Sequence, residues 1–339
     1  MKFAKTIQTI DSHTEGNPTR VIVGGVNPPP GQTLWERKEY LQEHDDDLRQ
    51  LLNFEPRGGG LMCSVLLMDP MLPEADFSIL IMEQEGYVPM CGHCAIGTAT
   101  TVVAEKMVQV HEPVTEVVLH TLAGLVRAQV QVVDGEPVAV TITNVESFLL
   151  MQDKQLSVEG IGEITIDLGY GGDFYPIIDA DALGIELTAA NEPVIVSTAC
   201  KIRESVQSQL SVIHPENPNI NSCYQVQFIS NKTETGSDIR NTVVAPPGAM
   251  DRSPCGTGTS LLTSRALMKG LIGINEEYRV EGPLGTFFCG RIIASELRDK
   301  IVYCTPQVSG RAFITGYNKF VLSDRDPFPA GCQVGLNAK

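Results

Sequence analysis

Two cysteine-glycine elements, separated by almost half of the chain, constrain this sequence more than any other feature. The first reads Met90-Cys91-Gly92-His93-Cys94-Ala95-Ile96-Gly97, and the second reads Ser253-Pro254-Cys255-Gly256-Thr257-Gly258-Thr259-Ser260. In both, a cysteine stands just before small residues that run on into a helix-like segment. The order of strands, cysteine and helix occurs twice, which predicts two related domains and places the two cysteines opposite each other across one substrate.

The segments around these elements predict an α+β fold. Alternation of apolar and polar residues with a period of two marks strands such as residues 6–10. Runs rich in Ala, Thr, Val and Ser after each cysteine predict helices that are buried on all sides. Further helices are expected at residues 33–52 and 190–210, and a polar turn at residues 11–18.

A chain of 339 residues is longer than one hydrophobic core usually supports, so we expect two domains. Residues 1–150 would form a first α/β domain that carries Cys91. Residues 151–339 would form a second that carries Cys255, with a boundary near residues 146–160. The C-terminal segment is a candidate to pack back on the first domain.

Composition and charge exclude several classes of partner. The net charge of −16 disfavours binding to nucleic acid and to anionic membranes. The nine cysteines are odd in number and scattered, which favours reduced thiols and a cytoplasmic protein over a disulfide framework. We find neither the apolar core of a signal peptide nor a run of about 18 apolar residues that would span a membrane. The expected partner is a small-molecule substrate, and a homodimer is the assembly we consider.

A cysteine at the start of a helix has a defined chemical use. Free backbone N–H groups and the helix dipole stabilise negative charge there, so the site favours a thiolate and also binds a carboxylate. Two such sites on opposite faces of an α-carbon permit a two-base inversion. One thiolate removes the α-proton while the other, still protonated, delivers a proton from the other side. No metal or pyridoxal cofactor is needed if water is excluded.

Two polar residues near the cysteines are candidates to bind the substrate. Asp251 precedes Cys255 by four positions and is placed to accept a hydrogen bond from a substrate amine. Its simpler role is as a turn or cap residue. His93 follows Cys91 by two positions and is a candidate to contact the amine or carboxylate, or to tune the thiol.

At these residues the chain resembles the proline racemase family. The matching motifs extend over almost the whole chain: residues 11–14 with Gly16, Pro18 and Arg20, residues 55–58, residues 90–93 with Ile96 and Gly97, residues 251–260, and residues 310–320. The resemblance implies a pseudo-symmetric fold like that of diaminopimelate epimerase, in which each domain is a curved sheet around a central helix and the active site lies in the interdomain cleft. It also implies cofactor-independent chemistry in which Cys91 and Cys255 are the acid–base pair. By the same resemblance, Gly92, His93, Gly256 and Thr257 bind the carboxylate, and Asp251 with His93 binds the ring amine.

The family includes proline racemases, 4-hydroxyproline 2-epimerases and trans-3-hydroxyproline dehydratases. Similar dehydratases usually carry threonine at the second cysteine, so Cys255 disfavours dehydration. Proline racemases tend to carry Phe at two pocket positions, where this chain has Cys63 and the segment 243–247. Smaller walls leave room for a ring hydroxyl, which favours the epimerase. The epimerases often place a His in the strand before the second motif, and this chain has Tyr224 and Gln225 there instead.

Two other readings of the first motif remain. Cys91-Gly92-His93-Cys94 has the C-x-x-C form of a thiol–disulfide oxidoreductase, but Pro89-Met90 precedes it in place of an aromatic residue, and Cys255 would have no role. Zinc binding by Cys91, His93 and Cys94 is less favoured still. A structural site needs a fourth ligand and more open spacing than this tetrapeptide offers.

Overall fold

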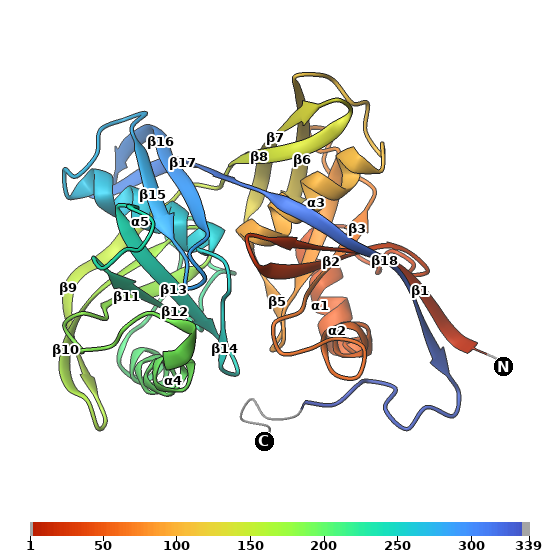
Figure 1. The fold of residues 1–339 in the computed structure, drawn as a ribbon. Coiled ribbons are helices and arrows are strands. Elements are labelled where there is room, and N and C mark those ends of the chain that lie inside the picture. The colour runs from red at the N-terminus through yellow and green to blue at the C-terminus, as the bar shows by residue number, and fades with distance from the viewer. Residues whose placement is uncertain (1–2, 334–339) are drawn as a thin grey trace. The chain divides into compact units, whose positions relative to one another are not determined.

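The computed structural model describes residues 3–333, and the chain divides into two compact units. The first unit consists of two segments, one that ends at Ile142 and one that begins at Arg311. The second unit comprises Thr143–Gly310. The sequence predicted a boundary near residues 146–160 and offered the C-terminal segment as a candidate to pack back on the first domain. In the structure the chain leaves the first unit after Ile142 and returns to it at Arg311, where the C-terminal strand begins (Figure 1).

The first unit contains three helices and nine strands among its described residues. Their bounds are β1 (Phe3–Thr14), β2 (Asn17–Gly24), α1 (Leu34–His44), α2 (Asp47–Asn53), β3 (Cys63–Met68), β4 (Phe77–Met82), β5 (Tyr87–Val88), α3 (Gly92–Ala104), β6 (Val114–Thr121), β7 (Gly124–Val133), β8 (Glu136–Thr143) and β18 (Ala312–Ser323). The last residue of β8 is the first of the second unit.

The second unit repeats this mixture of strands and few helices. Its elements are β9 (Phe148–Val158), β10 (Gly162–Tyr170), β11 (Phe174–Asp179), the short 3-10 helix η1 (Ala189–Asn191), α4 (Glu192–Gln209), β12 (Val226–Ser230), β13 (Ile239–Ala245), β14 (Ala249–Met250), α5 (Gly256–Met268), β15 (Glu277–Glu281), β16 (Phe287–Arg298) and β17 (Ile301–Gly310).

Helix α3 forms the centre of the first unit. Strands β1, β2, β3, β6, β7 and β18 all contact it, and each of its residues from Gly92 to Val103 is buried. Small side chains make this possible. A Cβ atom added to Gly97 would lie 3.0 Å from Oγ of Ser12, so the helix and strand β1 approach at the limit that glycine allows.

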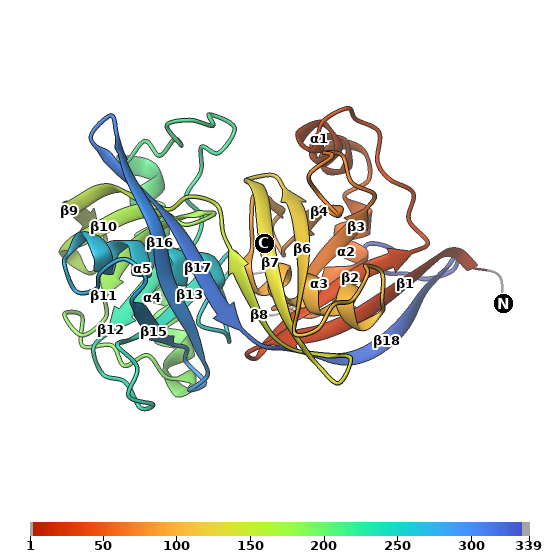
Figure 2. The same ribbon diagram turned by 90° about the horizontal axis from the view of Figure 1, so that it is seen from above.

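Helix α5 has the same place in the second unit. It contacts strands β9, β10, β15, β16 and β17, and its residues from Gly256 to Ser264 are buried. Figures 1 and 2 show α3 and α5 each surrounded by the strands of its own unit. The predicted α+β class, with a curved sheet around a central helix in each domain, is therefore confirmed.

Two of the expected local structures differ from the structure. Strands β1 and β2 continue through most of the predicted turn at residues 11–18, and only Glu15 and Gly16 remain as the turn, with positive φ angles of 45° and 106°. The predicted helix at residues 33–52 is broken at Asp45 and Asp46, which separate α1 from α2. In both places the polar residues are paired with other groups rather than left in a loop.

The pairing of these polar residues is clearest at Arg20 of β2. Its guanidinium donates to both carboxylate oxygens of Asp11, at 2.8–3.1 Å, and to the backbone carbonyls of Leu52 and Arg57. It also lies 4.1 Å from the centre of the Phe320 ring in β18. Strand β18 pairs antiparallel with β1, so this cluster joins the N-terminal hairpin to the C-terminal strand.

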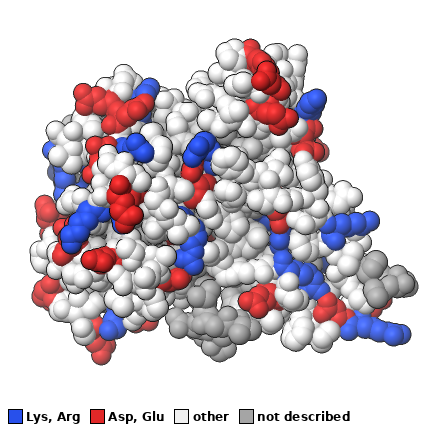
Figure 3. All heavy atoms as spheres, viewed as in Figure 1, with Lys and Arg blue, Asp and Glu red and all other residues white. Residues whose placement is uncertain are grey.

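The face of the molecule seen in Figure 3 carries charged side chains of both signs. On the face seen in Figure 3, acidic and basic side chains stand next to each other over both units. Among the described residues, no helix combines the length and the apolar character that crossing a membrane would require.

Candidate active site

Cys91 is the residue that precedes the first turn of helix α3. Its backbone is extended, with φ −140°, and the helix begins at the next residue, Gly92. The side chain is 7% exposed. Its Sγ lies 3.1 Å from Nδ1 of His93 and 3.9 Å from Nε2 of the same ring. The thiol therefore lies at a helix N-terminus, in direct contact with an imidazole.

The N-terminal hairpin holds His93 in place. Oγ1 of Thr14 donates a hydrogen bond of 2.9 Å to the His93 carbonyl. Nδ2 of Asn17 lies 3.3–3.4 Å from the two ring nitrogens. Thr14 and Asn17 flank the turn between β1 and β2, so this polar hairpin positions His93.

The contact between Cys91 and His93 favours an ion pair. Burial opposes ionisation of Cys91, but a hydrogen bond from Cys94 and the positive charge of His93 outweigh it, so the pKa of the Cys91 thiol lies well below its ordinary value. Burial likewise disfavours the charged imidazole, yet the negative charges of Cys91 and Cys63 raise the pKa of His93 well above its ordinary value. The arrangement supports a thiolate next to an imidazolium.

Two further cysteines surround His93. Sγ of Cys94 lies 3.4 Å from Nε2 of the imidazole, and the Cys94 side chain is fully buried. Cys63, the first residue of β3, brings its sulfur to the same ring. A hydrogen bond from Cys94 lowers the pKa of Cys63 to about 7, against the effect of burial and with the help of the His93 charge. The sequence identified Cys63 as a pocket wall but did not predict this contact.

Cys255 precedes helix α5 as Cys91 precedes α3. Both helices contain 13 residues and begin with glycine. Sγ of Cys255 accepts a hydrogen bond of 3.3 Å from the backbone N–H of Gly258 and lies 3.5 Å from Oγ1 of Thr257. Its φ of +58° is unusual for a residue with a side chain. Such backbone strain is concentrated at functional sites.

Tyr175 is a residue of this site that the sequence did not identify. Its hydroxyl lies 3.7 Å from Sγ of Cys255 and 2.6 Å from Oγ1 of Thr257. Burial first, and then the negative charge of Cys255, raise the pKa of Tyr175 well above its ordinary value, so the phenol stays protonated. The available signal was the glycine-rich bend before it, because Gly171 would place a Cβ only 2.3 Å from the Thr257 carbonyl oxygen.

Asp251 helps to shape the loop that leads to Cys255. Its Oδ1 accepts hydrogen bonds from the backbone N–H of Ser253, at 2.8 Å, and from the Ser253 hydroxyl, at 2.9 Å. The Ser253 hydroxyl in turn accepts a bond of 3.1 Å from the backbone N–H of Cys255. The turn role considered for Asp251 is thus present in the structure.

Two buried side-chain amides, of Asn241 and Gln227, also hold this loop by hydrogen bonds. Nδ2 of Asn241 donates to the Pro254 carbonyl at 2.5 Å, and Oδ1 of Asn241 accepts from Nε2 of Gln227 at 3.0 Å. Neither residue stood out in the sequence, because single amides inside strands carry no local signal. Together with Asp251 and Ser253 they hold the backbone that leads to Cys255.

The predicted site residues therefore form two groups, one in each unit. Cys91, Gly92 and His93 lie at the start of α3, and the second group, at the start of α5, comprises Asp251, Cys255, Gly256 and Thr257. Each group provides a buried thiol and the N–H groups of a first helical turn, which have no partner within the helix. Each is thus suited to hold an anion next to a sulfur atom.

Known proteins resemble this chain over nearly its whole length. The sequence profile described as proline racemase matches residues 9–333. The chain is 42% identical over 334 residues to a 4-hydroxyproline 2-epimerase of Streptosporangium roseum, covering 98% of this chain and 99% of that protein. It is 37% identical over 331 residues to a proline racemase of Clostridioides difficile, again covering 98% and 99% of the two chains.

A solved structure shares the fold at similar coverage. It is a hydroxyproline epimerase from Agrobacterium vitis with bound trans-4-hydroxy-L-proline, with a TM-score of 0.91 and 30% sequence identity, covering 98% of this chain and 96% of that one. The family expected from the motifs is therefore confirmed over nearly the whole length of the chain. The chain belongs to the proline racemase family of amino-acid isomerases.

Proposed function

We propose that this enzyme is a 4-hydroxyproline 2-epimerase that converts trans-4-hydroxy-L-proline to cis-4-hydroxy-D-proline without a cofactor. Cys91 acts on one face of the α-carbon and Cys255 acts on the other. One observation carries the proposal: in each unit a buried cysteine thiol immediately precedes the central helix. A one-base mechanism would give the second thiol no role.

The chemical step moves one proton off the α-carbon and another onto it. The Cys91 thiolate, stabilised by His93, removes the α-proton, and the Cys255 thiol delivers a proton to the opposite face. The enzyme is then left with the protonation states exchanged, and it is ready for the reverse reaction. The thiol is suited to both roles because its ordinary pKa of about 8.5 lies close to neutral pH.

The substrate carboxylate binds at the first helical turns. Backbone N–H groups of Gly92, His93, Gly256 and Thr257 act as its donors, and their dipoles stabilise the negative charge that develops when the α-proton leaves. Asp251 and His93 bind the ring amine. The Tyr175 hydroxyl, 2.6 Å from Oγ1 of Thr257, keeps that side chain oriented at the second thiol.

The preference for a hydroxylated ring rests on the size of the pocket walls and on the relatives. Cys63 lies next to His93, and Val243 belongs to the same buried cluster as Cys255, so the two wall positions that the sequence identified lie near the two thiols. Both side chains are smaller than phenylalanine. Of the two residues at the position of the expected histidine, Gln225 is buried and donates to Asp173, whereas Tyr224 is 53% exposed.

Proline racemase is the second candidate, because a proline racemase is 37% identical to this chain over its whole length. Dehydration of trans-3-hydroxyproline is disfavoured by the cysteine at position 255. Thiol–disulfide exchange through Cys91 and Cys94 is disfavoured because Cys94 has no exposed surface to offer a protein substrate. These alternative activities act on substrates other than trans-4-hydroxy-L-proline, so assays with the different substrates distinguish them.

A chiral assay with trans-4-hydroxy-L-proline and L-proline side by side tests the substrate. We expect a higher kcat/KM for the hydroxylated ring and formation of cis-4-hydroxy-D-proline. A higher kcat/KM for L-proline would identify a proline racemase instead. Loss of the hydroxyl from trans-3-hydroxy-L-proline, or reduction of insulin disulfides without inversion of either imino acid, would reject both.

A further inference from the structure

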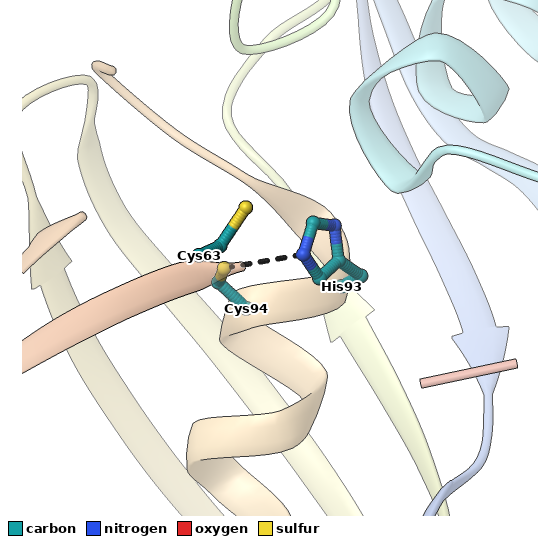
Figure 4. A group of neighbouring side chains, drawn as sticks. All are labelled: Cys63, His93 and Cys94. Atoms are coloured by element: carbon teal, nitrogen blue, oxygen red, sulfur yellow. Dashed lines mark hydrogen bonds between the residues drawn. The ribbon is translucent and has the colours of Figure 1, made fainter. Parts of the chain in front are cut away.

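Three potential metal ligands meet around one imidazole in the first unit. Sγ of Cys63, Sγ of Cys94 and a ring nitrogen of His93 all lie within 4.8 Å of one another, and all three side chains are buried. Figure 4 shows the sulfurs of Cys63 and Cys94 on the same side of the His93 ring. The residues come from two elements, β3 and the first turn of α3.

The proposed reaction transfers no proton through two of these residues. Inversion moves protons through Cys91 and Cys255, whereas Cys94 only donates a hydrogen bond to Cys91 and Cys63 lines the pocket. Buried cysteines often serve as small apolar side chains. Here, however, the Cys94 sulfur lies 3.4 Å from a ring nitrogen of His93, and the Cys63 sulfur lies within 4.8 Å of a nitrogen of the same ring.

Cys63 supplies a potential ligand from outside the tetrapeptide, which the sequence did not indicate. Cys91, His93 and Cys94 are too close together in the chain to surround an ion on their own. Cys63 lies on a separate strand, and its sulfur lies on the same side of the imidazole as that of Cys94. Ligands that come from two elements are typical of sites in which the fold, and not a short loop, sets the geometry.

We propose that Cys63, His93 and Cys94 form a binding site for a thiophilic metal ion such as Zn²⁺. Zinc bonds of about 2.3 Å to sulfur and about 2.0 Å to nitrogen place tetrahedral ligands roughly 3.5–3.8 Å apart. Nε2 of His93 and Sγ of Cys94 are already 3.4 Å apart. The remaining ligand pairs lie within 4.8 Å, so contraction by about 1 Å completes the triangle.

A bound ion would also change the state of the first thiol. Sγ of Cys91 lies 3.9 Å from Nε2 of His93, within reach of the fourth position around the ion. The ion replaces the protons of the thiols and the proton on Nε2, and these protons pass to solvent. Given the proposed function, which this step requires, a thiolate that is bound to metal and has lost its imidazolium partner no longer removes an α-proton. The site then makes inversion sensitive to thiophilic metals.

Metal binding is tested directly by titration of the reduced protein with Co²⁺ and then with Zn²⁺. We expect one equivalent of Co²⁺ to produce sulfur-to-cobalt charge-transfer bands and the d–d bands of a tetrahedral site, and Zn²⁺ to displace it. Cys63→Ala and Cys94→Ala should each raise the Kd at least about tenfold. Cys200→Ala, in α4 of the other unit, is the matched control and should leave the Kd unchanged.

The wild-type spectrum keeps the test decisive even if a variant does not fold. Absence of the tetrahedral cobalt bands in the wild type, or an unchanged Kd in folded Cys63→Ala and Cys94→Ala, would overturn the proposal. The effect on catalysis is measured as the ratio of activities with and without Zn²⁺, before and after a chelator. Tetrahedral cobalt bands in a protein that inverts no imino acid would reject the proposed function and leave the metal site intact.

Discussion

Nδ1 of His93 lies 3.1 Å from Sγ of Cys91, and both groups are buried at the start of helix α3. This contact favours the charged form of each group, the thiolate of Cys91 and the imidazolium of His93. Burial alone would keep the thiol protonated and the imidazole neutral. Their mutual attraction, together with the hydrogen bond from Cys94, reverses both preferences. The arrangement therefore favours a thiolate at Cys91.

Replacing His93 by glutamine tests this pairing. His93→Gln keeps a hydrogen-bonding side chain but removes the positive charge, so the pKa of the Cys91 thiol should rise toward the ordinary value of about 8.5. The measurement is the pH dependence of Cys91 alkylation by iodoacetamide, followed by mass spectrometry of the Cys91 peptide. His120→Gln, at a half-buried histidine of β6, is the control. An unchanged alkylation profile in His93→Gln would show that the imidazole does not stabilise the thiolate.

Gly171 sets how closely the chain approaches the second thiol. A Cβ atom at this position would lie 2.3 Å from the backbone oxygen of Thr257, so Gly171→Ala must displace the first turn of α5. We expect destabilisation by about 1–3 kcal/mol and a lower kcat. Gly86→Ala, where a Cβ meets no atom within 4 Å, is the matched control. Equal Tm and kcat in the two variants would mean that this close approach has no consequence.

Asp167 links α5 to strand β10 and makes stability depend on pH. Burial opposes its ionisation, but the Asp153 N–H and the side chains of Arg265 and Lys269 outweigh burial and depress its pKa. A depressed carboxyl pKa stabilises the folded state fully above the unfolded-state value of about 3.9, and this contribution disappears as pH falls through the folded-state pKa.

Asp167→Asn should therefore lower the free energy of unfolding at pH 7 by about 3 kcal/mol, the cost of breaking a buried ion pair. The difference from the wild type should shrink as the pH falls below the ordinary carboxyl range. Urea unfolding at several pH values measures it, with Glu163→Gln, exposed on the same strand, as the control. A difference that stays constant down to acid pH would contradict the depressed pKa.

Cys63 is expected to line the substrate pocket, so a larger side chain at this position should change the substrate preference. Cys63→Phe fills space next to His93, so kcat/KM for trans-4-hydroxy-L-proline should fall relative to that for L-proline, by about tenfold or more. The ratio of the two rates is the readout, since a general loss of folding lowers both together. A ratio equal to that of the wild type would place the ring hydroxyl away from Cys63.

Much of the fold and of the site could be predicted from local sequence patterns. The two Cys-Gly elements predicted two buried helices that begin after a thiol, and α3 and α5 begin at Gly92 and Gly256. This was possible because a buried helix of small residues and a cysteine before its first turn are both local features. The motifs then indicated the family, which the comparisons confirm.

Contacts between distant segments were not predictable in the same way. The hydroxyl of Tyr175, in the buried strand β11, contacts Thr257 of α5. The sulfur of Cys63, at the start of β3, lies near the ring of His93 in α3. The pairing of Asp11 with Arg20 also made a strand look like a polar turn, since buried charges carry no apolar pattern. In the first two cases the missing information was a partner far along the chain, and in the third it was a partner on the neighbouring strand.

The most direct test of the two-thiol mechanism follows the reaction in deuterated water during its first turnovers. We predict that the inverted product carries deuterium at the α-carbon while the recovered substrate carries almost none, because each face has its own proton donor. Cys91→Ser and Cys255→Ser should each lower the inversion rate by about 10²–10⁴-fold, with Cys200→Ser unaffected. Deuterium appearing equally in substrate and product from the start, or full inversion by Cys255→Ser, would contradict the account.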